Sequence, residues 1–419
     1  MRFVFIFLLV GQVCFVFGND GEQKYFEVSD IQIGLFSSGG FGKNQGKPIS
    51  GGYTNIFGSL DVLTQSFYGF DFGIGISAVA LLHKVKNQDV YSNINNNLIG
   101  IGFRINNDEA KDFRYTSDDV VFHTLYFRYS NSWGSLTFGR FPLSLDWVGD
   151  YAQGVGVELN KFDHYRIRAG WFDEQAYASP EENVHFGYMN KWYGTYEGYH
   201  IQNNYYLDVR FKNESIYWNA YYNYFQSLFN LAGIKANWKL ILNDWEFKSM
   251  AHYVFVSASS QSQEYCKDPN LSSIAGLACY VPGSMGKVNG YLWEIGERVK
   301  YQNWYLSLGY LQNDNKGATN NIAIYADDNP LEYNTVIYGS GSKTSYITLK
   351  YEYDGKYFLG LKYGVSWYGT GEGKSSQGQF NALGGIDFSH MNVSVAYVNI
   401  NDVSGYQNNI ARIYLGLKF

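Results

Sequence analysis

Basic residues recur on one side of several segments in which every second residue is apolar. They are Arg128, Arg166, Arg168, Arg210, Arg412, Lys235 and Lys239. Successive side chains of a strand point to opposite faces, so these groups would share the polar face of a sheet. If that face lines water, the positive charges would attract anionic groups. The alternative is that they pair with carboxylates of the same face, such as Asp208, and serve only to neutralise charge.

An irregular segment interrupts the alternation at residues 141–151, F-P-L-S-L-D-W-V-G-D-Y. It contains Asp146 and Asp150, and Arg140 directly precedes it. By its period Arg140 points outward with Leu136 and Phe138, but its position at the end of a strand would allow it to bend inward. The two acids would then oppose arginines across a constriction, and the transverse field would orient dipolar solutes.

Residues suited to catalysis are scattered. The histidines are His83, His123, His164, His185, His200, His252 and His390. None lies in a metal-ligand spacing or beside a serine nucleophile motif, and the period of its segment predicts that His123 faces outward. We therefore expect that the protein is not an enzyme and that it binds no metal ion and no cofactor. The 32 basic residues against 38 acidic ones also argue against a nucleic-acid partner.

The last nine residues, A-R-I-Y-L-G-L-K-F, show the element that positions these groups. Ala411, Ile413, Leu415, Leu417 and Phe419 fall on one face of a strand, and polar residues or glycine fall on the other. Nine residues are about the length that a tilted strand needs to cross a bilayer. A soluble β-sandwich also alternates, but the recurrence of this pattern along the whole chain favours a transmembrane β-barrel.

The composition agrees with a barrel that forms a single domain. The mean hydropathy is −0.27, and no segment beyond the N-terminus has the apolar length of a spanning helix. Alternation dilutes the apolar residues, so a barrel can insert with low hydropathy. Gly 46 and Tyr 39 are high counts and suit a curved sheet with aromatic girdles. The 6 prolines form no linker, so residues 19–419 are expected to be one barrel domain.

The N-terminus resembles a secretory signal peptide. Arg2 precedes an apolar run, and Gly18 is a small residue at the expected cleavage position, so residues 1–18 would be removed. An exported chain permits disulfides, and the two remaining cysteines, Cys266 and Cys279, are expected to form one in an external loop. A metal pair is the weaker alternative, because no histidine is near either cysteine.

Counting alternating segments predicts 18 antiparallel strands, with 16 as the alternative. Short turns at one end alternate with long segments at the other, as the two ends of an outer-membrane barrel require. The count of 18 places Leu98 to Ile105 within a loop. Other segments interpreted as loops are Gly39 to Gly52, Asp173 to Ile201, Ser257 to Gly290 and Gln312 to Thr344.

Several strings resemble OprD-like porins of the Opr/Hof branch. They are G-I-S-A-V-A-L-L at 75–82, W-G-S-L-T-F-G-R-F-P-L at 133–143, and the stretch from Thr137 to Tyr177 with L-D-W-V-G-D-Y and A-G-W-F-D-E-Q-A-Y. The resemblance implies an 18-stranded barrel whose third external loop folds inward, with basic residues along its inner wall. The third-loop segment here is short and poor in arginine, so substrate choice does not carry over.

Pattern and resemblance together predict an outer-membrane porin. It would be a water-filled channel for passive diffusion of small hydrophilic solutes or ions, narrowed near residues 141–151. The expected partners are outer-membrane lipid, small solutes and the outer-membrane assembly machinery, which would read the terminal Phe419. The chain would be a monomer or a homotrimer. The alternative is an adhesin or surface structural protein that acts through its long external loops.

Overall fold

The computed structural model describes the greater part of the chain as one sheet. The described ranges are 26–44, 46–84, 120–180, 183–187, 203–226, 229–260, 289–314, 330–331, 335–338, 341–369, 375–403, 405 and 407–419. The predicted signal peptide, the two cysteines and Leu98 to Ile105 lie outside these residues. Within the described part, no helix is long and apolar enough to span a membrane.

Nineteen strands and one short 3₁₀ helix, η3, make up the described elements. The strands are β1 (Phe26–Asn44), β2 (Lys47–Thr64), β3 (Phe70–Lys84), β4 (Val120–Asn131), β5 (Gly134–Pro142), β6 (Tyr151–Leu159), β7 (Tyr165–Ala178), β8 (Asn183–Gly187), β9 (Asn204–Lys212), β10 (Ile216–Phe225), β11 (Phe229–Leu242), β12 (Trp245–Ala258), β13 (Asn289–Tyr301), β14 (Trp304–Asn313), β15 (Lys343–Tyr353), β16 (Tyr357–Tyr368), β17 (Ser375–Asp387), β18 (Met391–Asp402) and β19 (Gln407–Lys418), and η3 covers Thr335–Tyr338.

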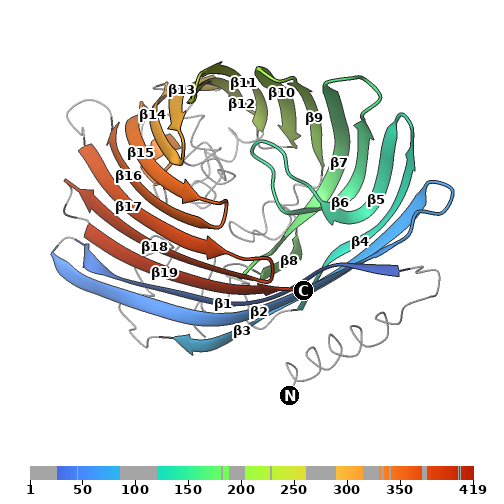
Figure 1. The fold of residues 1–419 in the computed structure, drawn as a ribbon, viewed down its shortest axis with the longest axis horizontal. Coiled ribbons are helices and arrows are strands. Elements are labelled where there is room, and N and C mark those ends of the chain that lie inside the picture. The colour runs from blue at the N-terminus through green and yellow to red at the C-terminus, as the bar shows by residue number, and fades with distance from the viewer. Residues whose placement is uncertain are drawn as a thin grey trace.

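Eighteen of these strands close into a ring (Figure 1). Each pairs antiparallel with its neighbours, β7 pairs with β9, and β19 pairs with β1 from Gln32↔Lys418 to Lys43↔Gln407. The short β8 pairs only with the end of β7 and contacts β3 and β4, so it is not a member of the ring. The prediction of an 18-stranded antiparallel barrel is confirmed, because the pairing of β19 with β1 gives each strand of the ring a partner on both sides.

The predicted alternation is present on the final strand. Ala411, Ile413 and Leu415 are exposed on the outer face, whereas Ile410 and Gly416 are buried. The tight turns joining β11 to β12, β13 to β14 and β15 to β16 hold Asn243, Gln302 and Asp354 at positive φ. Non-glycine residues adopt this backbone region mainly in turns, where asparagine and aspartate tolerate it best.

Several local predictions were wrong at the ends of strands. Gly39 to Gly52 forms a hairpin rather than a loop, because β1 and β2 stay paired to Asn44↔Lys47. The expected loop from Asp173 to Ile201 begins with the end of β7 and contains β8. Glycine-rich and polar ends of strands lack the apolar alternation that marks a spanning segment, so the sequence underestimated their length.

The prediction that the His123 side chain faces outward was also wrong. His123 is fully buried, and Phe122, which the alternation placed inward, is exposed. The register between β3 and β4 shifts between Gly75 and Ser77, and such a bulge reverses the facing of every residue beyond it. Closer to the β4–β5 turn the alternation is correct, because Leu125, Phe127 and Tyr129, which it assigns to the outer face, are exposed.

Candidate functional site

The segment joining β5 to β6, residues 143–150, turns into the barrel instead of continuing the wall (Figure 1). At its tip Trp147 has φ +67°, which is unusual for a bulky side chain and shows that its surroundings fix the backbone. We call residues 143–150 the inner loop. The inward third loop that the family resemblance implied is thus present as a structural feature.

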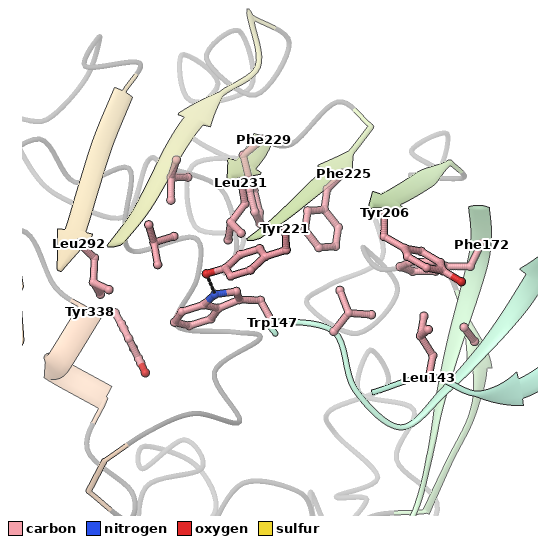
Figure 2. Packing of buried hydrophobic residues seen from close by; sticks show 14 of the residues in the cluster. Leu143, Trp147, Phe172, Tyr206, Tyr221, Phe225, Phe229, Leu231, Leu292 and Tyr338 are labelled. Carbon is pink, nitrogen blue, oxygen red and sulfur yellow. Dashed lines mark hydrogen bonds between the residues drawn. The ribbon is translucent and has the colours of Figure 1, made fainter. Parts of the chain in front are cut away.

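Aromatic packing attaches the inner loop to strands that are not its neighbours in the ring. Trp147 donates a hydrogen bond from Nε1 to the Tyr221 hydroxyl of β10 at 2.7 Å, and this hydroxyl lies 2.7 Å from Nε2 of His252 on β12. The Trp147 ring also meets the edge of Tyr338 in η3. Figure 2 shows Trp147, Tyr221 and Tyr338 in the largest buried apolar cluster of the described residues, in the interior of the barrel.

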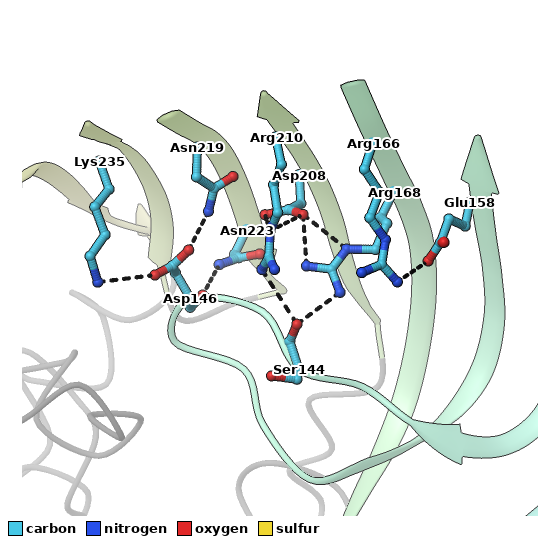
Figure 3. A network of polar contacts seen from close by, with 10 residues as sticks. All are labelled: Ser144, Asp146, Glu158, Arg166, Arg168, Asp208, Arg210, Asn219, Asn223 and Lys235. Atoms are coloured by element: carbon cyan, nitrogen blue, oxygen red, sulfur yellow. Dashed lines mark hydrogen bonds and ion pairs between the residues drawn. The ribbon is translucent and has the colours of Figure 1, made fainter. Parts of the chain in front are cut away.

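Polar contacts hold the same loop at the residues just before Trp147 (Figure 3). The Asp146 carboxylate accepts a hydrogen bond from Asn219 and lies 3.8 Å from the Lys235 ammonium group. The Ser144 carbonyl accepts hydrogen bonds from Arg168 at 2.8 Å and Arg210 at 3.5 Å. The inner loop is therefore fixed to β7, β9, β10 and β11 by its own backbone and side chains.

Most of the arginines selected from the sequence have acidic partners on the wall. Arg168 and Arg210 both bind Asp208, which is almost fully buried, at 2.7 and 3.0 Å. The Asp71 carboxylate accepts a hydrogen bond from the Arg128 guanidinium group at 3.0 Å, and Glu158 forms an ion pair with Arg166. These contacts match the alternative in which wall carboxylates neutralise the arginines.

Arg140 and Asp146 have different neighbours. The Arg140 guanidinium group lies 4.4 Å from the centre of the Phe186 ring on β8 and donates to Gln153 at 2.8 Å. Asp146 contacts β10 and β11, as described above. Asp150 lies at the base of the inner loop with φ +65°, and its backbone carbonyl accepts from Leu143. The described contacts therefore do not bring Arg140 and the two acids together as one opposed set.

The remaining predicted residues lie elsewhere on the wall. Arg412 lines a hollow of about 220 Å³ with Phe36, Phe358 and Tyr414, at the junction of the last strands and the first. Lys239 alternates with the exposed Trp238 and Leu240, which places it on the inner face of β11.

The structure reveals a row of cations of which the sequence pattern had selected only Lys239. Lys239 of β11 is the cross-strand partner of Lys248 on β12, and Lys248 is the partner of Arg298 on β13. The same row continues through Ser307 and Thr348 to Lys362 on β16. We call these six residues the cationic row.

A second group of cations lies beside this row. Lys300 and Lys350 are the cross-strand partners of Tyr305, and their ammonium groups lie 5.1 and 5.9 Å from its ring centre. The Arg298 guanidinium carbon lies 5.8 Å from the same ring. Glu352 pairs with Lys350 at 2.7 Å. Directly opposed like charges destabilise a sheet, so the pairing of Lys248 with Lys239 and Arg298 in the cationic row needs another reason than stability.

The sequence did contain part of this signal. Arg298 and Lys300 fall on the polar phase of their strand, but only the register shows that Lys248 lies directly beside Arg298. No group of three or more potential metal ligands occurs among the residues that the structure describes.

Comparison with known proteins supports the fold strongly, although the sequence identities are low. No protein-family model and no curated protein matches the chain. The solved structure of Acinetobacter baumannii OccAB4 superposes with a TM-score of 0.70 at 12% identity, covering 96% of this chain and 100% of that one. Pseudomonas aeruginosa OccK8 (OprE) gives 0.65 at 10% identity, with 93% and 98% covered.

A third structure, the outer membrane protein opdK from Pseudomonas aeruginosa, gives a TM-score of 0.64 at 8% identity, covering 94% of this chain and 99% of that one. At such identities the likeness shows the fold. The resemblance to OprD-like channels is confirmed at that level, over nearly the whole length of both chains.

Proposed function

We propose that the chain is a passive diffusion channel of the bacterial outer membrane. It would carry small hydrophilic solutes or ions through a barrel narrowed by the inner loop. The fold supports this proposal, because the ring is closed and the known structures that match it include an outer membrane protein. Polar and charged side chains on the inner face suit a water-filled lumen.

The charge distribution of the inner wall carries a more specific proposal, a preference for anions. On β4, β7 and β9 the arginines form ion pairs with Asp71, Glu158 and Asp208. On β11 to β13 the cationic row places Lys239, Lys248 and Arg298 side by side, with no acid between them in the register. The net field in the lumen would therefore come mainly from the β11–β16 side.

Reversal potentials in planar bilayers under a salt gradient test this proposal. We expect anion preference in the parent channel and a shift towards cations in Lys248→Gln/Arg298→Gln. The shift should shrink as salt rises, because the Debye length is about 8 Å at physiological ionic strength. The matched control is Arg166→Gln/Glu158→Gln, which removes an ion pair without changing net charge. An equal shift in the control would contradict the proposed role of the cationic row.

The same experiment separates the channel from the adhesin alternative. A folded, heat-modifiable barrel that inserts into the bilayer without conducting would argue against a channel. The barrel would then serve as a scaffold for its external loops.

A further inference from the structure

A carboxylate on the outer wall has no role in the proposed channel. Glu297 lies on β13 opposite Leu308 of β14, and Leu308 and Ile295 are both about half exposed on the outer face. The side chains of Arg298 and Lys300 point to the opposite face of β13 and contact the Tyr305 ring inside the barrel. Glu297 therefore faces outward.

Its depth is midway across the apolar belt. Trp293, four residues before Glu297 on β13, packs against Tyr310 at 5.2 Å between ring centres. Tyr301, four residues after it, stacks on Trp245 at 4.5 Å. Such aromatic rows mark the two membrane interfaces of a barrel. A carboxylate between them faces hydrocarbon and costs free energy unless it is paired.

Glu297 also lies in a hollow. Ser249, Ala251 and Glu297 contribute to a depression of about 420 Å³ whose sides include Trp238, Ile295 and Leu308. For comparison, an apolar cavity of about 150 Å³ can take up benzene. The hollow is thus large enough for an aromatic side chain to enter.

The groups beside the hollow complement it. Trp238, Ser249, Glu297 and Leu308 follow one another in a single cross-strand row. Ser249 donates to one Glu297 oxygen at 2.5 Å, and a carboxylate has capacity for further donors. Trp238 is about half exposed, and its indole N–H has no hydrogen-bond acceptor among the described contacts. One patch therefore offers a bulky donor next to a hollow that contains an acceptor.

We propose that this patch pairs two copies of the chain side by side in the membrane. The Trp238 of each copy would lie in the hollow of the other and donate its indole N–H to Glu297. Two barrels inserted in the same direction are related by a two-fold axis along the membrane normal, which brings the same patch of each copy to the same depth. This inference requires the membrane location but not ion conduction.

Photo-crosslinking in intact cells tests the proposal. A benzoylphenylalanine probe at Ile347, the next residue in the row after Leu308, should yield an adduct of twice the chain mass. The matched control is the probe at Ile74, an exposed outer position on β3, which lies across the ring (Figure 1). It should yield no such adduct.

Variants then test the chemistry of the contact. Glu297→Leu should fold at least as well as the parent chain, because it removes a polar group from lipid, yet it should lose most of the adduct. Trp238→Leu should lose it too, whereas Glu297→Gln keeps an acceptor oxygen and should retain it. The inference is overturned by an absent dimer adduct, an equal adduct at Ile74, capture of another protein, or an adduct that Glu297→Leu leaves unchanged. Conductance, measured separately, reports on the proposed function.

Discussion

Trp147 at the tip of the inner loop donates its indole N–H to the hydroxyl of Tyr221 at 2.7 Å. The two residues belong to the segment between β5 and β6 and to β10, which are separated in the ring by β6, β7 and β9. The contact therefore extends across the interior. Because a hydroxyl that accepts from Trp147 still has its own proton, Tyr221 can donate it to His252.

Trp147→Ala should release the inner loop and raise single-channel conductance. The loop is not part of the ring, so losing about 3–5 kcal/mol of buried aromatic packing should weaken the attachment of the loop rather than the stability of the barrel. Trp147→Phe keeps a buried aromatic ring but loses the hydrogen bond to Tyr221, about 1 kcal/mol, and part of the ring packing, so it should change conductance less than Trp147→Ala. Trp133→Ala, at the exposed β4–β5 turn, is the control and should leave conductance unchanged.

Asp208→Asn should destabilise the barrel far more than Glu158→Gln. Asp208 is almost fully buried between Arg168 and Arg210, and removing one member of a buried ion pair costs about 3–5 kcal/mol. Glu158 pairs with a half-exposed Arg166, for which about 0.2–1 kcal/mol is expected. The temperature at which the folded band is lost in heat-modifiability gels measures both. Equal shifts would contradict this account of Asp208.

Lys248→Gln should stabilise the barrel slightly while reducing anion preference. Lys248 lies between Lys239 and Arg298 in the register, and relief of directly opposed like charges is worth about 0.2–1 kcal/mol. The same gels, read beside the reversal potential, show whether stability and selectivity change in opposite directions. Lys356→Gln in the exposed β15–β16 turn should change neither property. A destabilised Lys248→Gln barrel would mean that an acid compensates this lysine.

Phe419→Asp should reduce the amount of folded barrel in the outer membrane. The Phe419 amide donates to the Ile31 carbonyl at 3.1 Å where β19 closes on β1, and its ring is largely exposed. This geometry leaves the terminal aromatic ring accessible, as its predicted recognition by the assembly machinery requires, and a charge there would also oppose entry into lipid. Phe419→Trp is the conservative control. Normal levels of heat-modifiable Phe419→Asp barrel would refute the prediction.

The sequence by itself determined the fold class and favoured the strand count that the structure has, 18 rather than 16. Where no bulge interrupts a spanning strand its side chains alternate with a period of two, so the order of residues in a segment such as Ala411 to Phe419 is enough to separate its two faces. It also identified the inner-loop segment, because Phe141 to Tyr151 breaks that period. Strand ends such as Gly39 to Gly52 were missed because polar, glycine-rich pairing beyond the apolar belt carries no alternation.

Only the tertiary structure decided which charges meet. Alternation places Arg168, Asp208 and Lys248 on the inner face but does not tell which neighbour each one has. That depends on register and on a bulge of one residue, which turned His123 inward beside Asp61 at 3.1 Å. The registers of other strand pairs placed Arg168 beside Asp208 and Lys248 beside Arg298. Closure of the ring also brought Trp147 to Tyr221, because contacts across a barrel join residues that no local pattern relates.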